Sequence, residues 1–98
     1  MTKYIYVISC ASSDEAPCKI GISDNPEKRV KQLQTGHPKK LKIKYTKELD
    51  NARLYEKRLH KDMSYLRSHG EWFNLSVSEA IEQINFTLIH HESSELIP

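Results

Sequence analysis

The chain has 98 residues, of which 38% are hydrophobic and 29% are charged, and its formal net charge is +2. A chain of this length forms one small domain with its own core and leaves no room for a second. The longest apolar run, residues 4–8, is far shorter than the roughly 20 residues of a membrane helix, and no signal-peptide pattern precedes it. We therefore expect a cytoplasmic protein that does not act at a membrane.

Positive charge is concentrated in the first half of the chain. Residues 1–45 carry nine Lys and Arg against four Asp and Glu, whereas residues 46–98 carry six against nine. A polyanion would bind the basic half, because Lys and Arg that neutralise phosphates release condensed counterions. A solvated surface of mixed charge is the alternative explanation. The two cysteines are too few for a disulfide framework and are expected to be free thiols.

Two strands are predicted near the start of the chain, over residues 3–10 and 18–23. Both runs are rich in β-branched or aromatic residues, and a polar loop separates them. Alternation places Tyr6 on one face of the first strand and groups Lys19 with Gly21 on one face of the second. A hairpin brings these two faces into register.

A helix is predicted to begin after Asn25, because Asn caps free N–H groups and Pro26 suits the first helical position. Gly36 marks its end, and Val30 and Leu33 are its inward residues. A third strand is predicted over residues 40–46, where apolar residues alternate with lysines.

The longest helical pattern runs over residues 51–67, with Ala52, Tyr55, Leu59 and Met63 at helical spacing. Residues 71–75 are short, aromatic and predicted to be extended.

Ser76 and Glu79 then fit a capping box that opens a closing helix. The fold class predicted from this order is α/β, with a three-stranded, mainly antiparallel sheet flanked by helices. Residues 1–91 form the single domain in this prediction, and residues 92–98 form a frayed tail.

Six polar residues stand beside apolar positions that are expected to be structured. They are Tyr6, Lys19, Arg29, Glu56, His60 and Asn74. Each has an ordinary structural explanation when taken alone, such as a solvated helix residue or a core aromatic with a satisfied hydroxyl. Taken together, they follow a family pattern.

Five short motifs, in order, resemble those of the GIY-YIG nuclease superfamily, and particularly its small phage and bacterial branch whose second motif is KIG. In this chain they are Tyr4-Ile5-Tyr6, Lys19-Ile20-Gly21, the stretch from Gly21 through Pro26 to Arg29, Glu56 with Leu59-His60, and Glu71-Trp72-Phe73-Asn74. The resemblance covers about residues 4–75. It implies a GIY-YIG-like domain that hydrolyses phosphodiesters with one divalent ion, Mg²⁺ or Mn²⁺.

The resemblance also implies roles for individual residues. Tyr6 would deprotonate or orient the attacking water, Arg29 would grip the scissile phosphate, and Glu56 would be the sole carboxylate ligand of the metal. His60 would serve as a proton shuttle or as a partner of the metal ligand, and Asn74 would support the site.

Lys19 stands where the superfamily has its second tyrosine. A cation there is expected to stabilise developing charge on the phosphate and to lower the pKa of Tyr6. Tyr4 likewise stands where the first motif has a glycine.

Nucleic acid is the expected partner, and DNA the expected substrate, with a homodimer or a partner protein supplying any targeting. The residues expected to follow its backbone without reading bases are Lys28, Arg29, Lys31, Lys39, Lys40, Lys42 and Lys44. Two alternatives stay open at this point. One is an inactive module on the same scaffold that binds nucleic acid or protein, and the other is a structural or regulatory phage protein.

Overall fold

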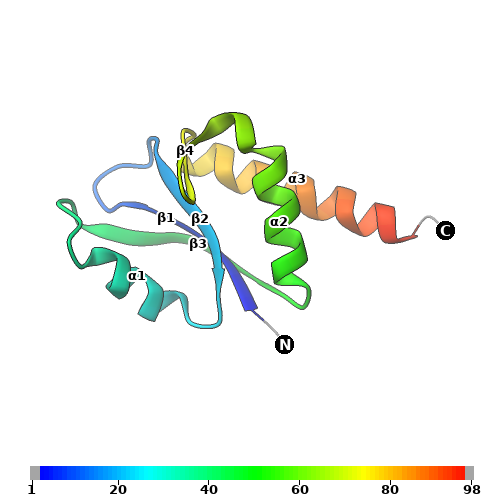
Figure 1. Ribbon diagram of the computed structural model, residues 1–98, viewed down its shortest axis with the longest axis horizontal. Coiled ribbons are helices and arrows are strands. Elements are labelled where there is room, and N and C mark those ends of the chain that lie inside the picture. Colours follow the sequence, from blue (N-terminus) through cyan, green and yellow to red (C-terminus); the bar gives the residue numbers. More distant parts are fainter. Residues whose placement is uncertain (1–2, 97–98) are drawn as a thin grey trace.

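The structure is a computed structural model that describes residues 3–96, with side chains described up to residue 90. Figure 1 shows three strands crossing the middle of the molecule, with helices around them. In chain order the elements are β1 (Lys3–Cys10), β2 (Cys18–Ser23), α1 (Pro26–Gln34), β3 (Leu41–Leu49), α2 (Ala52–Asp62), a 3₁₀ turn (Ser64–Leu66), β4 (Arg67–His69), β5 (Trp72–Phe73) and α3 (Val77–Leu96).

Within residues 3–96 the sheet has five strands in the order β3-β1-β2-β5-β4, and each neighbouring pair is antiparallel. The predicted mixed α/β class and antiparallel pairing are confirmed. The prediction of three strands is wrong, because β5 pairs with β2 and β4 extends the sheet beyond it. These strands have two and three residues, too few to show alternation in a sequence.

The β1–β2 hairpin has the register that alternation predicts. Tyr6 lies opposite Gly21, and Ile8 lies opposite Lys19. Directly opposed residues of an antiparallel pair project from the same face. These four residues therefore share one face of the sheet.

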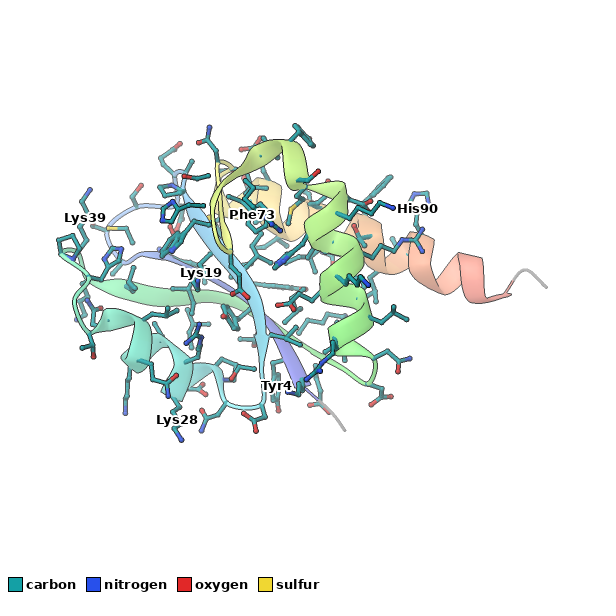
Figure 2. All side chains as sticks on the ribbon, viewed as in Figure 1. Tyr4, Lys19, Lys28, Lys39, Phe73 and His90 are labelled. Atoms are coloured by element: carbon teal, nitrogen blue, oxygen red, sulfur yellow. The ribbon has the colours of Figure 1, made fainter. Side chains whose placement is uncertain are left out.

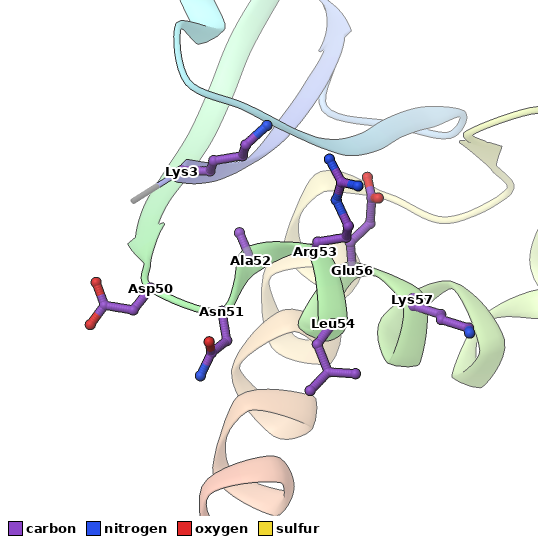
Figure 3. Close-up of a pocket in the computed structure, with 8 residues that line it drawn as sticks. All are labelled: Lys3, Asp50, Asn51, Ala52, Arg53, Leu54, Glu56 and Lys57. Carbon is purple, nitrogen blue, oxygen red and sulfur yellow. The ribbon is translucent and has the colours of Figure 1, made fainter. Parts of the chain in front are cut away.

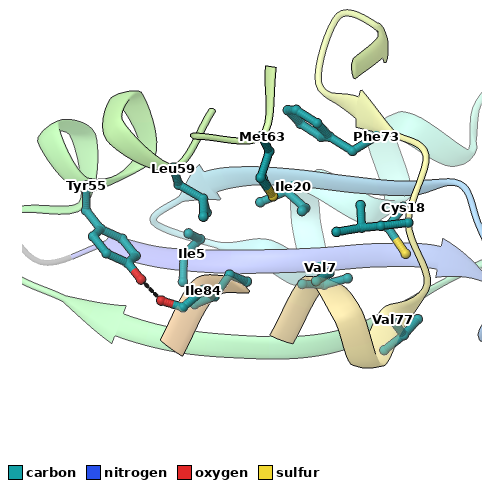
Figure 4. Close-up of a cluster of buried hydrophobic side chains, with 12 residues drawn as sticks. Ile5, Val7, Cys18, Ile20, Tyr55, Leu59, Met63, Phe73, Val77 and Ile84 are labelled. Carbon is teal, nitrogen blue, oxygen red and sulfur yellow. Dashed lines mark hydrogen bonds between the residues drawn. The ribbon is translucent and has the colours of Figure 1, made fainter. Parts of the chain in front are cut away.

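Helices cover the two faces unequally. Helix α1 covers the Tyr6 face, where a small cluster forms from Tyr6, Ile8 and Leu41 with the partly buried Val30, Leu33, Ile43 and Trp72. Helices α2 and α3 pack on the other face and bury the larger cluster, which includes Ile5, Val7, Ile20, Tyr55, Leu59, Met63, Phe73 and Ile84. In Figure 4 the Tyr55 hydroxyl donates to the backbone carbonyl of Ile84, which joins α2 to α3.

Local signals set both ends of α1. The Lys28 N–H donates to Asn25 Oδ1 at 3.1 Å, and Pro26 occupies the start of the helix. Gly36 follows the helix with a φ of 81°, a conformation that glycine adopts without steric cost. The predicted inward positions Val30 and Leu33 pack against the small cluster. The third strand continues to Leu49, three residues beyond its predicted end.

Helix α2 ends at Asp62, so the prediction of a helix over residues 51–67 is wrong at its C-terminal end. The predicted apolar positions from Ala52 to Met63 are all buried. Leu66 continues the same spacing, but it packs on the core from the 3₁₀ turn. The chain then forms β4, which pairs with β5.

Helix α3 opens with the predicted capping box. The Ser76 N–H donates to Glu79 Oε1 at 2.9 Å, and the Glu79 N–H donates to Ser76 Oγ at 3.2 Å. The helix continues to Leu96, through most of the segment 92–98 that was predicted to be frayed, and residues 97 and 98 lie outside the described residues. No helix within residues 3–96 combines the length and apolarity that a membrane crossing requires.

Candidate active site

β5 and the residue before it, Glu71, cover the N-terminal part of the edge of β2 that faces away from β1. Lys19 lies opposite Trp72, and the Ile20 N–H donates to the Glu71 carbonyl at 3.1 Å. This pairing holds Glu71 next to the middle of β2. It therefore brings a residue far along the chain beside the KIG motif.

The second part of that edge is covered by side chains from α2. Nε2 of His60 donates to the Ile20 carbonyl at 2.9 Å, and the Glu56 carboxylate accepts a hydrogen bond from the backbone of Ile22. The spacing of four residues puts Glu56 and His60 on one side of the helix, where they match alternate residues of the strand. Because the carbonyl only accepts, Nε2 carries the proton, and any proton shuttling by His60 would use Nδ1.

Gly21 is the point at which two functional groups approach the β2 backbone. A Cβ at this position would lie 2.6 Å from Tyr6 Oη and 2.7 Å from Glu71 Oε2. Both distances are shorter than real Cβ contacts, so a Cβ here would force the buried Tyr6 ring and the Glu71 side chain to move. The phenol of Tyr6 and the Glu71 carboxylate therefore face one small region above Gly21.

The Tyr6 hydroxyl is hydrogen bonded to Arg29 of α1. Tyr6 is only 1% exposed, and this burial raises the pKa of its phenol. Arg29 opposes the rise, whereas the negative charges of Glu71 and Glu56 add to it. The expectation that Lys19 lowers the pKa of Tyr6 is wrong, because burial raises this pKa and the cation that opposes the rise is Arg29.

Lys19 is a buried cation with an acidic partner. Its Nζ lies 3.7 Å from Glu71 Oε2 and 5.6 Å from the centre of the Trp72 ring. Burial lowers the pKa of the Lys19 ammonium, Glu71 raises it, and the like charge of Arg29 lowers it. In Figure 2 the Lys19 side chain lies over the middle of the sheet. Lys19 is thus linked to the Tyr6 region through Glu71, and its charge lies near enough to Arg29 for the two cations to repel.

Glu56 carries its carboxylate to the same region from α2. Burial raises the pKa of Glu56, and the nearby Glu71 adds to that rise, while His60 and the backbone of Ile22 lower it. On its other side Glu56 borders an open pocket of about 670 Å³ that Lys3, Arg53 and Lys57 also line. Figure 3 shows Arg53 and Glu56 extending from α2 towards the light blue strand β2.

Five of the six predicted site residues therefore meet along β2. We call this cluster the β2 site; it consists of Tyr6, Lys19, Arg29, Glu56 and His60, together with Glu71. The structure does not bring Asn74 to it. Asn74 is exposed beyond the end of β5, and its N–H donates to the Leu66 carbonyl at 2.7 Å.

Glu71 belongs to the β2 site, although the sequence did not predict it as a site residue. It was present as the first residue of the fifth motif, after Gly70, whose φ of 55° turns the chain between β4 and β5. Its carboxylate reaches the β2 site only because β5 pairs with β2. Asn74 belongs to the same motif, but it lies three residues after Glu71. Each residue of an extended chain adds about 3.3 Å to the distance from the β2 site.

The predicted nucleic-acid-binding lysines do not form one surface. Lys28 and Lys31 are exposed on α1, on the Tyr6 face, and Figure 2 shows Lys28 pointing outward. Lys42 lies opposite Ser9, which places it on the other face of the sheet. Lys44 forms an ion pair with Asp14 at 2.8 Å. The exposed Lys39 and Lys40 lie in the connection between α1 and β3.

The β2 site can bind a hard cation only if water or a bound phosphate supplies most of the ligands. Among the residues that the structure describes, no three or more His, Cys, Asp or Glu side chains are grouped tightly enough to hold an ion. Mg²⁺ commonly keeps several waters and takes only one or two protein carboxylates together with phosphate oxygens. Glu56, with Glu71 close by, meets that requirement.

Comparison with known proteins identifies one family. No curated protein and no solved structure matches the chain. Residues 3–88 match the T5orf172 domain, a span that begins with β1, includes all six residues of the β2 site and ends within α3. The chain therefore belongs to the T5orf172 domain family.

Proposed function

We propose that this protein is a divalent-metal-dependent endonuclease of GIY-YIG type, which hydrolyses phosphodiester bonds in nucleic acid, with DNA as the expected substrate. The supporting observation is the meeting of the Tyr6 hydroxyl, the Arg29 guanidinium and the Glu56 carboxylate, from β1, α1 and α2, around Gly21. A hydroxyl, a cation and a carboxylate are the groups that phosphodiester hydrolysis requires.

Arg29 and Lys19 supply the binding of the phosphate in this proposal. The planar guanidinium of Arg29 can contact two phosphate oxygens at once, and the Lys19 ammonium adds a point charge beside it. Lys19 is buried, so little water screens its charge. Donors fixed in such a place stabilise the charge that develops on phosphate oxygens during attack.

Tyr6 orients the attacking water as a neutral phenol. The pKa of Tyr6 is raised, so the phenol keeps its proton at neutral pH, and the hydrogen bond from Arg29 holds the phenolic oxygen in place. A neutral hydroxyl can donate to the water or to a phosphate oxygen. Glu71, which faces the same region, is the nearby carboxylate that can accept a proton.

Glu56 would hold the Mg²⁺ or Mn²⁺ ion, with water and phosphate oxygens as the other ligands. When bound, such an ion neutralises charge on the phosphate and lowers the pKa of a coordinated water. A hydrogen bond from the backbone of Ile22 would help to orient the Glu56 carboxylate towards such an ion. Substitution of Glu56 is therefore the most direct test of the proposal.

The test incubates the protein with single-stranded, double-stranded and branched DNA and with RNA, each with Mg²⁺, Mn²⁺ or a chelator. We expect cleavage that requires the ion and that Glu56→Ala abolishes while leaving binding largely intact. Arg29→Ala should weaken both. Glu82→Ala is the matched control, because Glu82 is an exposed glutamate on α3, a helix of the opposite face.

Two outcomes would contradict the proposal. Cleavage that persists in Glu56→Ala with chelator present would come from another source. Intact substrates in every condition, combined with salt-sensitive binding, would instead identify an inactive binding module on this scaffold.

A further inference from the structure

A second concave surface lies at the end of β1, beyond Lys19. It is a hollow of about 340 Å³, within the usual size range of small-molecule sites. The residues that matter for its chemistry are Trp72, His37, Leu41, Ser12, Ser13 and Lys39. We call it the Trp72 hollow.

The strand register joins the Trp72 hollow to the β2 site. Ile8, Lys19 and Trp72 form a row across β1, β2 and β5, next to the row formed by Tyr6 and Gly21. Neighbouring rows on one face of a sheet are about 7 Å apart. Trp72 therefore lies in the same row as Lys19, one row along the sheet from Tyr6 and Gly21.

The walls of the hollow combine aromatic and polar groups. The His37 ring stacks on Trp72 with centroids 5.8 Å apart and an angle of 24° between planes, and Leu41 supplies aliphatic surface. The Ser12 and Ser13 hydroxyls add polar atoms at the rim. Flat apolar walls with a few hydroxyls suit a planar heterocycle that has polar edges.

The charge at the rim favours an anionic ligand. Lys39 lines the hollow, and the exposed Lys40 lies beside it with Cys10 and Ser12. Glu15 also reaches the rim, so the three side chains together carry one net positive charge. Figure 2 shows Lys39 at the outer end of this side of the molecule. Cations thus lie on both sides of the aromatic wall, with Lys19 at its inner end.

We propose that the Trp72 hollow receives an unpaired nucleobase from the nucleotide next to the phosphate that Lys19 and Arg29 bind. This inference rests on the proposed function and specifies its substrate class. A base inside a duplex is paired and stacked on both sides, and it reaches such a pocket only by leaving the helix. The preferred substrate is therefore nucleic acid with a single-stranded segment at the site.

The chain provides its own probe, because Trp72 is its single tryptophan. A short single-stranded DNA is compared with the same sequence as a duplex and with a strand of equal length in which abasic sites replace the bases. All titrations contain chelator, so no strand is cut. Binding is followed by anisotropy of a labelled strand, and base contact by Trp72 fluorescence.

We expect the single strand to quench Trp72 fluorescence and to bind about tenfold more tightly than the abasic strand, since one stacked base contributes that much. Trp72→Leu should remove most of this preference while leaving the affinity for the abasic strand nearly unchanged. Lys42→Gln is the control on the opposite face of the sheet. If Trp72→Leu fails to fold, the inference is tested by the wild-type protein alone, through its binding of the single strand, the duplex and the abasic strand.

Three outcomes would overturn the inference, and they are distinguishable. Equal affinity for normal and abasic strands without a fluorescence change removes the base site but leaves nucleic-acid binding intact. A duplex that binds and quenches as strongly as the single strand removes the requirement for an unpaired base. Absence of binding to every strand removes the nucleic-acid function itself and this inference with it.

Discussion

Lys19 Nζ lies 3.7 Å from Glu71 Oε2, so the buried cation of the β2 site already has an acidic neighbour. Glu71 is the more exposed partner, with 37% of its side chain accessible against 9% for Lys19. A phosphodiester that approached Lys19 would compete with this carboxylate for the same ammonium. We therefore expect Glu71 to limit how tightly an anion would bind at the site.

Glu71→Gln should strengthen the binding of single-stranded DNA in the absence of metal. The gain should be about twofold, because the exposure of Glu71 lets water screen its charge. Anisotropy titrations at low salt measure it, with Glu82→Gln as the control. Weaker binding by Glu71→Gln would show that Glu71 supports the anion-binding geometry instead of opposing it.

Gly21→Ala should destabilise the protein by about 1–3 kcal/mol, because the new Cβ would overlap Tyr6 Oη and Glu71 Oε2. Denaturant unfolding measures the cost. Tyr6→Phe removes the closest of these atoms, so the double variant should lose less stability than the two single variants together. Strictly additive costs would contradict the packing described around Gly21.

Replacing both Lys28 and Lys31 with Gln should weaken single-stranded DNA binding and reduce the slope of log affinity against log salt by roughly 1.4. Both lysines are exposed on α1, which covers the face that carries Tyr6. Lys42→Gln serves as the matched control on the opposite face. An equal change of slope in Lys42→Gln would place the nucleic acid elsewhere.

Glu79→Gln should lower the melting temperature at neutral pH. Hydrogen bonds from Ser76 lower the pKa of Glu79 below its ordinary value of 4.5 in the folded state. Its contribution is therefore present above that value and is lost as the pH falls through the folded pKa. The melting temperatures of the two proteins should converge in acid, once the pH has fallen below the folded-state pKa of Glu79. A difference that persists there would show that charge is not the cause.

Sequence patterns predicted the elements whose signals are local. Asn25 with Pro26 marked the start of α1, and Ser76 with Glu79 marked the start of α3, because capping depends on residues three positions apart. Alternation gave the face shared by Tyr6 and Gly21. The end of α2 was mispredicted because Leu66 fits the helical spacing, although it packs on the core from a different conformation.

The site was predictable only in part, because its completion depends on long-range pairing. The pairing of β5 with β2 brings Glu71 close to Lys19 and leaves Asn74 outside, and a two-residue strand gives little signal in the sequence. The direction of the Tyr6 pKa shift depends on how deeply the ring is buried. Neighbouring charges, which a sequence does suggest, were the smaller influence.

Helix α2 is attached to β2 through main-chain atoms, since His60 and Glu56 bond to the backbone of Ile20 and Ile22. Such an attachment does not depend on which amino acids the strand carries. Apolar residues of β2 can therefore be replaced by others of similar volume during evolution or redesign, while the Glu56 carboxylate stays in the same place.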